Sequence, residues 1–490
     1  MTERDLRHYG TRLLLILFAL TLYRVLAAQW IQLELYGDEA YYFGWAQSLE
    51  WGYYSKPPMV GWLIWLTTNL CGDSEPCVRL AAYLLYPATA FVLFLLGSRL
   101  FAPRVGFWAA LAYITLPMVS LGSWFITTDA ALLFFWTLAL YFLARALDHN
   151  RWHDWLGLAV ALGLGGLSKY SMVFFGLGGL ALLAMNTEAR RQLRNPRLYA
   201  AIGLAFLIFL PNLIWNAQHQ FVSVEHTAEI SRLGRQWFRP EKLAEFLGGQ
   251  FIVMGPLLFA AFGHLALRHG FNLVTDRRYQ FLFAFSVPAL AVFILLAFLT
   301  RAFANWGAMA YVAGVLLVTA WWLARNRLRW LQAAIALNVV IMLGLYHYHA
   351  LAQWAGIELT RKTDPYSRVS GWRALGGEVQ KLLEAHPNAR LLSNDRKLLA
   401  ELVYYVRPHP FDAMSYNPSG NIGDHYALMH DLKRTPQGEF LLIGDQIDPA
   451  RLAQEFEQVV DLGEIRIPLY RDFDRTARVW WLRNFKGYAR

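Results

Sequence analysis

Two carboxylates and a lysine occur close together in a polar stretch between the first two long apolar segments of the chain. Asp38 and Glu39 begin a helix-like segment, and Lys56 precedes two prolines. Adjacent helix positions do not share a face, so we expect the two acids to point in different directions and to do different work. One carboxylate can serve as a general base, and a lysine ammonium can bind a phosphate. Two simpler interpretations stay open: acids complement the dipole of a helix N-terminus, and a lysine can reach toward lipid headgroups.

Further polar residues lie at the ends of other apolar segments. Asp129 follows two threonines, Lys169 lies in a short turn, and Arg301 and Asn305 precede an apolar segment. Ionisable groups at membrane depth are functional candidates, although Asp129 can equally be part of a helix cap. We expect Lys169 and Arg301 to join Lys56 in binding a phosphate, and Asp129 and Asn305 to position an acceptor or a loop.

Histidines and a glutamate in a second polar stretch raise the question of a metal site. His219, Glu225 and His226 carry side chains that bind metals, but their spacing matches no HExxH motif. Histidines in a loop are more often hydrogen-bonded at a surface, so we expect no metal here, and a divalent metal stays possible without support. His226 is expected instead, like Tyr54, to position the acceptor or a loop.

The only two cysteines of the sequence are Cys71 and Cys77, in CGDSEPC. Gly72 and Pro76 favour a tight turn that brings the two Cα atoms within the roughly 4.4–6.8 Å that a disulfide requires. Disulfides form outside the cytoplasm, where we place this stretch. The pattern predicts a disulfide, and two buried free thiols are the alternative.

The composition indicates that these residues are carried by a polytopic membrane protein. Of the 490 residues, 56% are apolar and 16% are charged, whereas about 25% are charged in soluble proteins. So few charges cannot cover a soluble fold of this length, which excludes a secreted enzyme, a disordered chain and a cytosolic Rossmann enzyme. Apolar segments of about 20 residues span a membrane. We expect eleven spans, at residues 13–30, 78–98, 105–122, 127–147, 154–168, 170–185, 199–217, 250–267, 280–299, 304–323 and 329–350.

The basic residues predict the orientation of these spans. The formal net charge of +10 is concentrated in alternate short loops, which the positive-inside rule places in the cytoplasm, so we do not read it as nucleic-acid binding. The charged N-terminus runs directly into an apolar segment without a cleavage site, as in an uncleaved first span. The N-terminus is then cytoplasmic, and the outer loops 31–77 and 218–249 and the C-terminus lie outside. Residues 57–70 are too short to span and are expected to form an interfacial or re-entrant helix.

The character of the chain changes at about residue 357. Residues 371–386 have the pattern of an amphipathic helix, and residues 389–394, 438–445, 456–465 and 477–485 have the pattern of strands. Strands that alternate with helices predict a small α/β domain at residues 357–490, outside the membrane. The fold class is therefore an all-α membrane domain, residues 1–350, followed by this soluble extracytoplasmic domain.

Several short motifs, taken in order, resemble a known family. They are DE at 38–39, KPP at 56–58, RLAAYL at 79–84, TTDA at 127–130, GLSKYS at 166–171, WNAQH at 215–219 and ANW at 304–306. This order resembles the GT-C membrane glycosyltransferases, specifically the bacterial relatives of protein O-mannosyltransferase and the lipid A aminoarabinose transferases. The resemblance covers roughly residues 10–350, and the C-terminal domain also has counterparts there.

The resemblance implies roles for individual residues. Asp38 matches the catalytic base of the family, Glu39 its second acid, and Lys56 the lysine that binds the donor phosphate. Ser55 stands where some aminoarabinose transferases have an acid linked to a metal, and Tyr41 stands where many relatives have an arginine. These departures weaken the case for a metal and for aminoarabinose as the donor sugar.

The sequence thus predicts an inverting glycosyltransferase of the inner membrane. It would move a sugar from polyprenyl phosphate to lipid A, lipopolysaccharide, another envelope glycan or a protein, on the outer face of the bilayer. Phosphate is already a fair leaving group, so one base suffices where glycoside hydrolysis uses two carboxyls, and no cofactor is required. The alternative is a transporter or flippase of lipid-linked sugars, which would need broken helices at the membrane midplane. A second alternative is a receptor or scaffold, whose outer loops would not need a pocket that combines an acid with cations.

Overall fold

The computed structural model describes residues 3–230, 239–269, 275–445 and 447–489. The chain forms two compact units, each built from segments that are discontinuous in sequence. We call them the helical unit, Met1–Ala28, Lys56–Val60 and Arg79–His347, and the mixed unit, Gln29–Ser55, Gly61–Val78 and Tyr348–Arg490. The C-terminal segment of the mixed unit begins at Tyr348, whereas we expected the chain to change character at about residue 357. Most of the loop 31–77, which we assigned to the membrane domain, packs with the C-terminal residues.

The helical unit consists of long apolar helices joined by short turns. Its longer helices are α1 (Glu3–Trp30), α4 (Glu75–Leu100), α7 (Thr128–His149), α8 (Trp152–Ser168), α11 (Pro196–Gln218) and α19 (Leu328–Tyr346). Its shorter helices are α5 (Pro103–Ile114), α6 (Pro117–Gly122), α9 (Phe174–Met185), α10 (Thr187–Arg191), α12 (Val222–Ile230), α13 (Pro240–Val253), α14 (Pro256–His264), α16 (Arg277–Ala284), α17 (Val287–Leu299) and α18 (Ala310–Ala324). Single turns η1 (Tyr170–Val173), η2 (Gln192–Arg194), η3 (Leu265–His269) and η4 (Ala304–Gly307) connect them.

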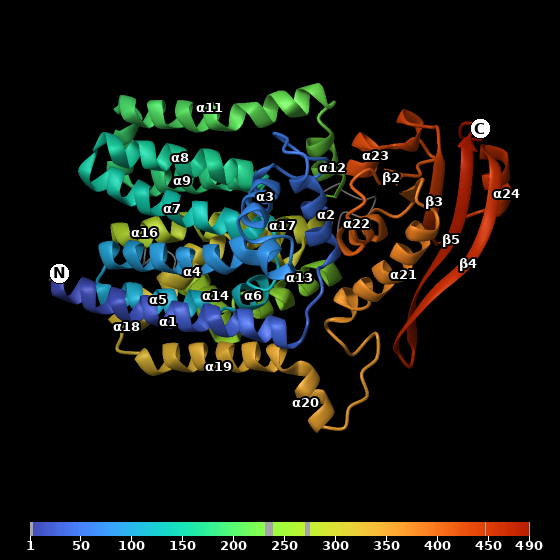
Figure 1. Ribbon diagram of the computed structural model, residues 1–490. Coiled ribbons are helices and arrows are strands. Elements are labelled where there is room, and N and C mark those ends of the chain that lie inside the picture. Colours follow the sequence, from blue (N-terminus) through green and yellow to red (C-terminus); the bar gives the residue numbers. More distant parts are fainter. Residues whose placement is uncertain (1–2, 231–238, 270–274, 446, 490) are drawn as a thin grey trace. The chain divides into compact units, whose positions relative to one another are not determined.

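The core of the helical unit is organised around α18. Every residue from 310 to 322 is buried, as expected of a helix that is apolar on all sides. Helices α5, α14, α16 and α19 pack around it. In a separate row, α8 lies between α7 and α11 (Figure 1).

Several of the expected spans are broken helices, and proline explains the breaks. The predicted span 105–122 divides before Pro117, and the region 250–267 divides where Gly255, with φ of 85°, precedes Pro256. Proline lacks an amide donor and disfavours helical geometry in the residue before it. In the described residues, six helices are long and apolar enough to cross a membrane, or up to eight if each bent pair counts as one span. The structure therefore supports several membrane-spanning helices, and the number eleven remains a prediction.

The mixed unit contains a five-stranded sheet. The strands are β1 (Ala389–Ser393), β2 (Met414–Ser415), β3 (Glu439–Gly444), β4 (Phe456–Tyr470) and β5 (Phe473–Phe485), in the order β2-β1-β3-β5-β4. Strands β1, β2 and β3 run parallel, and β5 is antiparallel to both β3 and β4. The four expected strands are confirmed as β1, β3, β4 and β5, whereas β2 is too short for a recognisable pattern.

Helices from the first long loop and from the C-terminal region complete the mixed unit. They are α2 (Gly37–Ala46), most of α3 (Met59–Cys71), α20 (Tyr348–Trp354), α21 (Trp372–Ala385), α22 (Arg396–Tyr405), α23 (His425–Met429) and α24 (Pro449–Glu455), with turns η5 (Ser367–Val369) and η6 (Leu432–Arg434). Helix α2 packs against α22, and α21 packs against α22 (Figure 1). A buried apolar cluster that includes Phe440, Leu452 and Trp480 joins the sheet to α24.

A disulfide joins Cys71, the last residue of α3, to Cys77 in the first turn of α4. The two Cα atoms are 5.8 Å apart. The bond closes a short turn within the mixed unit and fixes how the chain leaves α3.

Candidate active site

The carboxylate of Asp38 lies at the start of α2 and is accessible to solvent. Its side chain is 43% exposed, and its Oδ1 atom lies 3.3 Å from a guanidinium nitrogen of Arg396 on α22. Burial acts to lower the pKa of Arg396, but the negative charge of Asp38 acts in the opposite direction, and the net effect is a raised pKa. The guanidinium therefore stays charged and orients a carboxylate that is still open to a second partner.

Glu39 is buried and holds the backbone that carries Asp38. Its exposed fraction is 1%, and its Oε2 atom accepts a hydrogen bond from the backbone N–H of Tyr36, 2.9 Å away. This contact is one half of a capping box, in which a residue in the first turn satisfies a free donor at the helix N-terminus. The adjacent acids thus point in different directions, as expected, and the geometry gives Glu39 a positioning role.

Aromatic packing immobilises α2 within the mixed unit. The rings of Trp45 and Tyr53 are stacked 4.5 Å apart, and the Tyr53 hydroxyl donates to the carbonyl of Trp45 at 2.9 Å. The Tyr41 hydroxyl accepts a hydrogen bond from the backbone N–H of His425. Burial raises the pKa of Tyr41 well above its ordinary value, so this hydroxyl stays protonated. Tyr41 therefore has a structural task at the position where many relatives of the resembled family carry an arginine.

A second cluster of candidates lies in the helical unit, where three distant segments meet at Asp129. The ammonium of Lys169 donates to Asp129 Oδ1 at 2.6 Å, and the amide of Asn305 donates to Asp129 Oδ2 at 3.0 Å. Thr127 is the N-cap of α7 and its side chain accepts from the backbone of Asp129. Because the threonine does the capping, the carboxylate of Asp129 is available to join α7 to the α8–η1 junction and to η4.

This pairing changes the expected role of Lys169. The side chains of Lys169 and Asp129 are 16% and 11% exposed, so the pair is largely removed from water. A buried cation that is already paired gives little net charge to a ligand. The geometry therefore favours a positioning role for Lys169 over the expected direct contact with phosphate.

The remaining donor-site candidates are spread over both units. Lys56 belongs to the helical unit and is partly buried, while its neighbour Tyr54 belongs to the mixed unit and is buried. Arg301 is 53% exposed, lies 3.9 Å from Glu245, and extends over the ring of Phe303. An exposed guanidinium in such a loose pair remains available to an anion.

The histidine stretch does not form a metal-binding cluster. Among the described residues, no group of three or more histidine, cysteine, aspartate or glutamate side chains is arranged to hold a metal ion. The His219 ring stacks on Trp215 and makes a 2.8 Å hydrogen bond with its carbonyl. Glu225 and His226 lie on α12, exposed and half-buried respectively.

Arg24, a cation within the first apolar helix, is satisfied by neutral groups. It is fully buried and donates to the hydroxyls of Ser123 and Ser120, at 2.9 and 3.1 Å, and to the carbonyl of Ile114 at 2.6 Å. Its partners belong to α5, α6 and the residue after α6, so the side chain ties α1 to these helices. These contacts to neutral groups give Arg24 a structural role.

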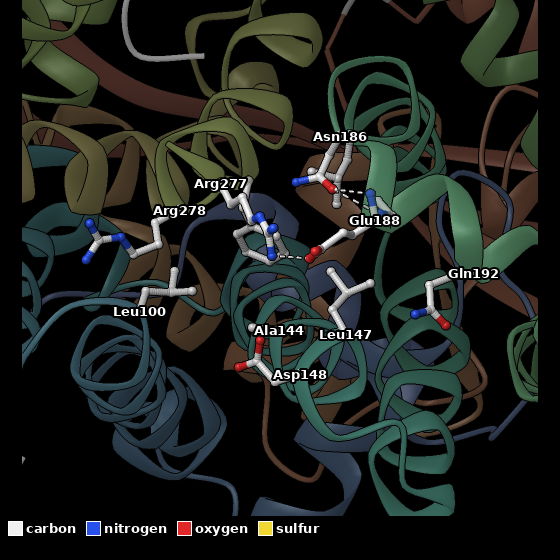
Figure 2. A pocket seen from close by; sticks show the side chains of 12 residues that line it. Leu100, Ala144, Leu147, Asp148, Asn186, Glu188, Gln192, Arg277 and Arg278 are labelled. Carbon is white, nitrogen blue, oxygen red and sulfur yellow. Dashed lines mark hydrogen bonds and ion pairs between the residues drawn. The ribbon is translucent and has the colours of Figure 1, made fainter. Parts of the chain in front are cut away.

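A cavity of about 130 Å³ lies in the helical unit near the opposite end of α7 from Asp129. Figure 2 shows Arg277 directed at Glu188, and these two form an ion pair. The other charged side chains that line the cavity are also paired, Asp148 with Arg99 and Arg278 with Asp276. The pairs Arg277–Glu188 and Asp148–Arg99 join different helices, whereas Arg278 pairs with the N-cap residue of its own helix. The charged side chains that line this cavity are therefore all paired.

Sequence reasoning missed the residue that orients Asp38. Arg396 is 358 positions away from Asp38 along the chain, and nothing in the local sequence of α22 marks it. The same is true of His425, whose backbone anchors Tyr41.

The chain has relatives among proteins of known activity. Residues 55–215 match the family described as dolichyl-phosphate-mannose-protein mannosyltransferase. The chain is 32% identical to the lipid A galacturonosyltransferase RgtD of Rhizobium johnstonii, over 88% of this chain and 90% of the relative. It is 31% identical to the lipopolysaccharide core galacturonosyltransferase RgtA of the same organism, over 36% of each chain. The fold is similar to the crystal structure of ArnT from Cupriavidus metallidurans bound to undecaprenyl phosphate, with a TM-score of 0.63, 16% identity, and coverage of 95% of this chain and 97% of that one.

The long apolar helices and the fold shared with ArnT define an integral membrane protein. The similarity to RgtD extends over nearly the whole chain, so the family is settled: the chain belongs to the GT-C glycosyltransferases of the ArnT and protein-mannosyltransferase type. The predicted family and the predicted enzyme class are confirmed, and the transporter alternative falls away. The protein is an inner-membrane glycosyltransferase.

Proposed function

We propose that this protein transfers a galacturonosyl residue from polyprenyl phosphate to lipid A or to the lipopolysaccharide core. The observation that carries the proposal is the 32% identity with a lipid A galacturonosyltransferase over 88% of the chain. A second galacturonosyltransferase matches part of the chain. Ser55 and Tyr41 depart from the aminoarabinose-transferase pattern, which also favours a different donor sugar. Lipid and glycan acceptors are preferred to protein because both relatives act on lipopolysaccharide components.

The proposed reaction is a single displacement. The acceptor hydroxyl attacks the anomeric carbon, its proton passes to the Asp38 carboxylate, and the bond between the anomeric carbon and the phosphate oxygen breaks. Polyprenyl phosphate leaves with the bonding electrons, and the configuration at the anomeric carbon inverts. Asp38 suits the role of base because its carboxylate is 43% exposed and held by Arg396. One positioned base contributes about 10²–10⁴-fold to such a step.

Lys56 and Arg301 are proposed to bind the phosphate of the donor. Fixed cations stabilise the charge that develops on a leaving phosphate. Arg301 is exposed and only loosely paired, and Lys56 is partly buried and precedes two prolines. Glu39 and the group formed by Asp129, Lys169 and Asn305 position these segments, as Tyr54 and His226 are expected to do. The scheme needs no metal.

The proposed setting is the outer face of the inner membrane, with the N-terminus in the cytoplasm and eleven spans. The six long apolar helices and two bent pairs account for part of this number. The remaining spans would be formed by shorter helices such as α8 and α18, which pack inside the bundle. The basic residues concentrated in alternate loops support this orientation.

Mass spectrometry of lipid A tests the proposal. Cells that express the chain are expected to contain lipid A or core species heavier by one hexuronosyl residue than cells without it. Purified protein given polyprenyl-phosphate galacturonate and lipid A should form the same product. A product that carries another sugar would refute the proposed donor, and unchanged lipid A and core in both experiments would refute the proposed acceptor.

A further inference from the structure

A cleft of about 640 Å³ lies in the mixed unit at the carboxyl ends of two parallel strands. Asn394 and Asp395, which follow β1, and Asp445, which follows β3, line it. In the order β2-β1-β3, the chain leaves β1 toward β2 on one side and returns as β3 on the other. Open α/β sheets bind ligands at such a point, outside the carboxyl ends of the strands. The volume lies within the roughly 300–1,000 Å³ of small-molecule sites.

Three cations line the cleft, and each lies near an aromatic ring that also lines it. The guanidinium of Arg361 lies 4.2 Å from the ring centre of Phe473, and that of Arg475 lies 3.6 Å from the ring centre of Trp372. The Lys397 ammonium lies 5.4 Å from the same Trp372 ring. Stacking on rings orients cations but does not neutralise their charge.

None of these three cations forms an ion pair with a carboxylate in the part of the chain that the structure describes. Arg475 donates to the backbone carbonyl of Ser370 at 3.0 and 2.7 Å, which leaves its charge in place. The acid closest to Lys397 in sequence on the same helix face is Glu401, which is fully buried. Burial raises the pKa of Glu401 well above its ordinary value, against the pull of Lys397 and Arg475. A carboxyl that stays protonated does not compensate the cations. Three acids, Asp395, Asp445 and Asp474, also line the cleft, so it carries charges of both signs, with the cations gathered at the rings of Trp372 and Phe473.

The strand ends supply hydrogen-bond acceptors to the same cleft. Asp395 Oδ1 accepts from the backbone of Leu398 at 2.7 Å and so caps α22. Among the described residues, the Asp445 carboxylate has no hydrogen-bond or ion-pair partner. Burial raises the pKa of Asp445 most, and the negative charges of Asp395 and Glu464 raise it further. Carboxylates of this kind accept hydrogen bonds from hydroxyl groups.

We propose that this cleft binds an anionic saccharide, a sugar that bears a phosphate or a carboxylate. The cations would hold the anionic group, and Asp395 and Asp445 would accept hydrogen bonds from the sugar hydroxyls. Arg396, the residue before Lys397, is the partner of Asp38, so the cleft and the proposed base are attached to one helix. That the saccharide belongs to the acceptor rests on the proposed function, whereas binding itself does not.

Calorimetric titration of the purified full chain in lipid nanodiscs tests this proposal. The probes are glucose 1-phosphate, galacturonic acid, glucose and inorganic phosphate. We expect one or both anionic sugars to bind more tightly than glucose and than phosphate alone, and which of the two binds better identifies the anionic group. Arg361→Gln and Lys397→Gln should each weaken binding by about tenfold, the effect of losing one charge-assisted hydrogen bond.

Lys381→Gln is the matched control, because Lys381 is an exposed cation on α21 that pairs with Glu378 and does not line the cleft. Its binding should equal that of the wild type. If Lys397→Gln does not fold, the binding measured with Arg361→Gln, a variant at an exposed position, tests the proposal on its own. Glucose binding as tightly as the anionic sugars, phosphate binding as tightly as glucose 1-phosphate, or wild-type affinity in Arg361→Gln would each overturn the proposal. These results do not depend on whether the enzyme transfers galacturonate.

Discussion

At the scale of single residues, the pair formed by Asp38 and Arg396 shows which part of the candidate site local sequence can predict. Asp38 was a candidate from sequence alone, because an acid in an outer loop beside a lysine and two prolines is informative. Its orientation by Arg396 was not predictable, since the contact joins positions 358 residues apart. In the same way, Asp129, Lys169 and Asn305 were each identifiable as polar groups at apolar segments, but not as one cluster. Such clusters depend on tertiary packing, for which local sequence gives no signal.

Asp38→Asn is expected to abolish most transfer while the protein folds normally. Asparagine keeps an oxygen for Arg396 but cannot take a proton, so we expect the rate to fall by at least about 10²-fold. Initial rates of galacturonosyl transfer by purified enzyme measure this loss. Glu378→Gln, an exposed acid on α21, serves as the control and should keep the wild-type rate. A wild-type rate in Asp38→Asn would exclude Asp38 as the base.

Lys56→Ala is expected to weaken the binding of polyprenyl phosphate itself, because the proposed contact is to the carrier and not to the sugar. Losing a charge-assisted hydrogen bond should lower affinity by about tenfold. Titration of undecaprenyl phosphate into protein in nanodiscs checks the prediction, with Lys381→Ala as the control. If transfer falls while carrier affinity is unchanged, Lys56 has another role.

The pair of Asp129 and Lys169 should show strong coupling in a double-mutant cycle. Lys169→Met leaves a buried carboxylate without its cation, which costs about 3–5 kcal/mol. Asp129→Asn combined with Lys169→Met removes both charges, so we expect it to be less destabilising than Lys169→Met alone. Thermal unfolding of the four proteins gives the coupling. Additive effects would mean that the 2.6 Å contact does not stabilise the fold.

At the scale of elements, local patterns carried most of the information for the mixed unit. Strands β1 and β3 follow from short, buried apolar runs, and α21 follows from its amphipathic pattern. Strand β2, with two residues, has no pattern of its own and exists because it pairs with β1. In the helical unit, the breaks at Pro117 and Pro256 carried a signal in the sequence that a hydropathy count overlooks.

The contact between α20 and the following loop should make stability depend on pH. His349 lies 3.0 Å from both carboxylate oxygens of Asp364, whose hydrogen bond raises the pKa of His349. Burial alone would raise the pKa of Asp364, but hydrogen bonds from His349 and Tyr470 lower it overall. The histidine's contribution is therefore complete below about pH 6.5, its ordinary pKa, and is lost as pH rises through the raised value. The aspartate's contribution is present above about pH 4 and is lost as pH falls through the lowered value.

His349→Gln should remove the alkaline part of this dependence. The wild-type melting temperature is expected to fall relative to that of His349→Gln between about pH 6 and pH 8.5. Within the pair of His349 and Asp364, only His349 loses a proton in this range. Thermal unfolding in nanodiscs across this range measures the difference. His8→Gln, an exposed histidine near the N-terminus, is the control and should follow the wild type. Parallel curves for the wild type and His349→Gln would contradict the prediction.

At the scale of the whole molecule, the proposed orientation can be tested by labelling. Arg194→Cys and Ser419→Cys place single new thiols at exposed positions of the helical and mixed units. A membrane-impermeant reagent added to cells with an opened outer membrane should label the thiol at position 419 and not that at 194. Both should react after lysis. Equal reactivity of the two in intact inner membranes would mean that the number of spans between them is even.

The discontinuous mixed unit has a consequence for how the protein is made. Helix α2 is synthesised early, but its partner α22 follows only after the whole run Arg79–His347. At about 5–20 residues per second, that interval lasts tens of seconds. During it, Trp45 and Tyr41, which are buried in the finished protein, have no partner helix, whereas the turn between Cys71 and Cys77 is complete and can be oxidised at once. In the proposed orientation, α2 would therefore be exposed outside the cytoplasm until α22 is made, and a chain that stops near residue 350 would leave it without that partner.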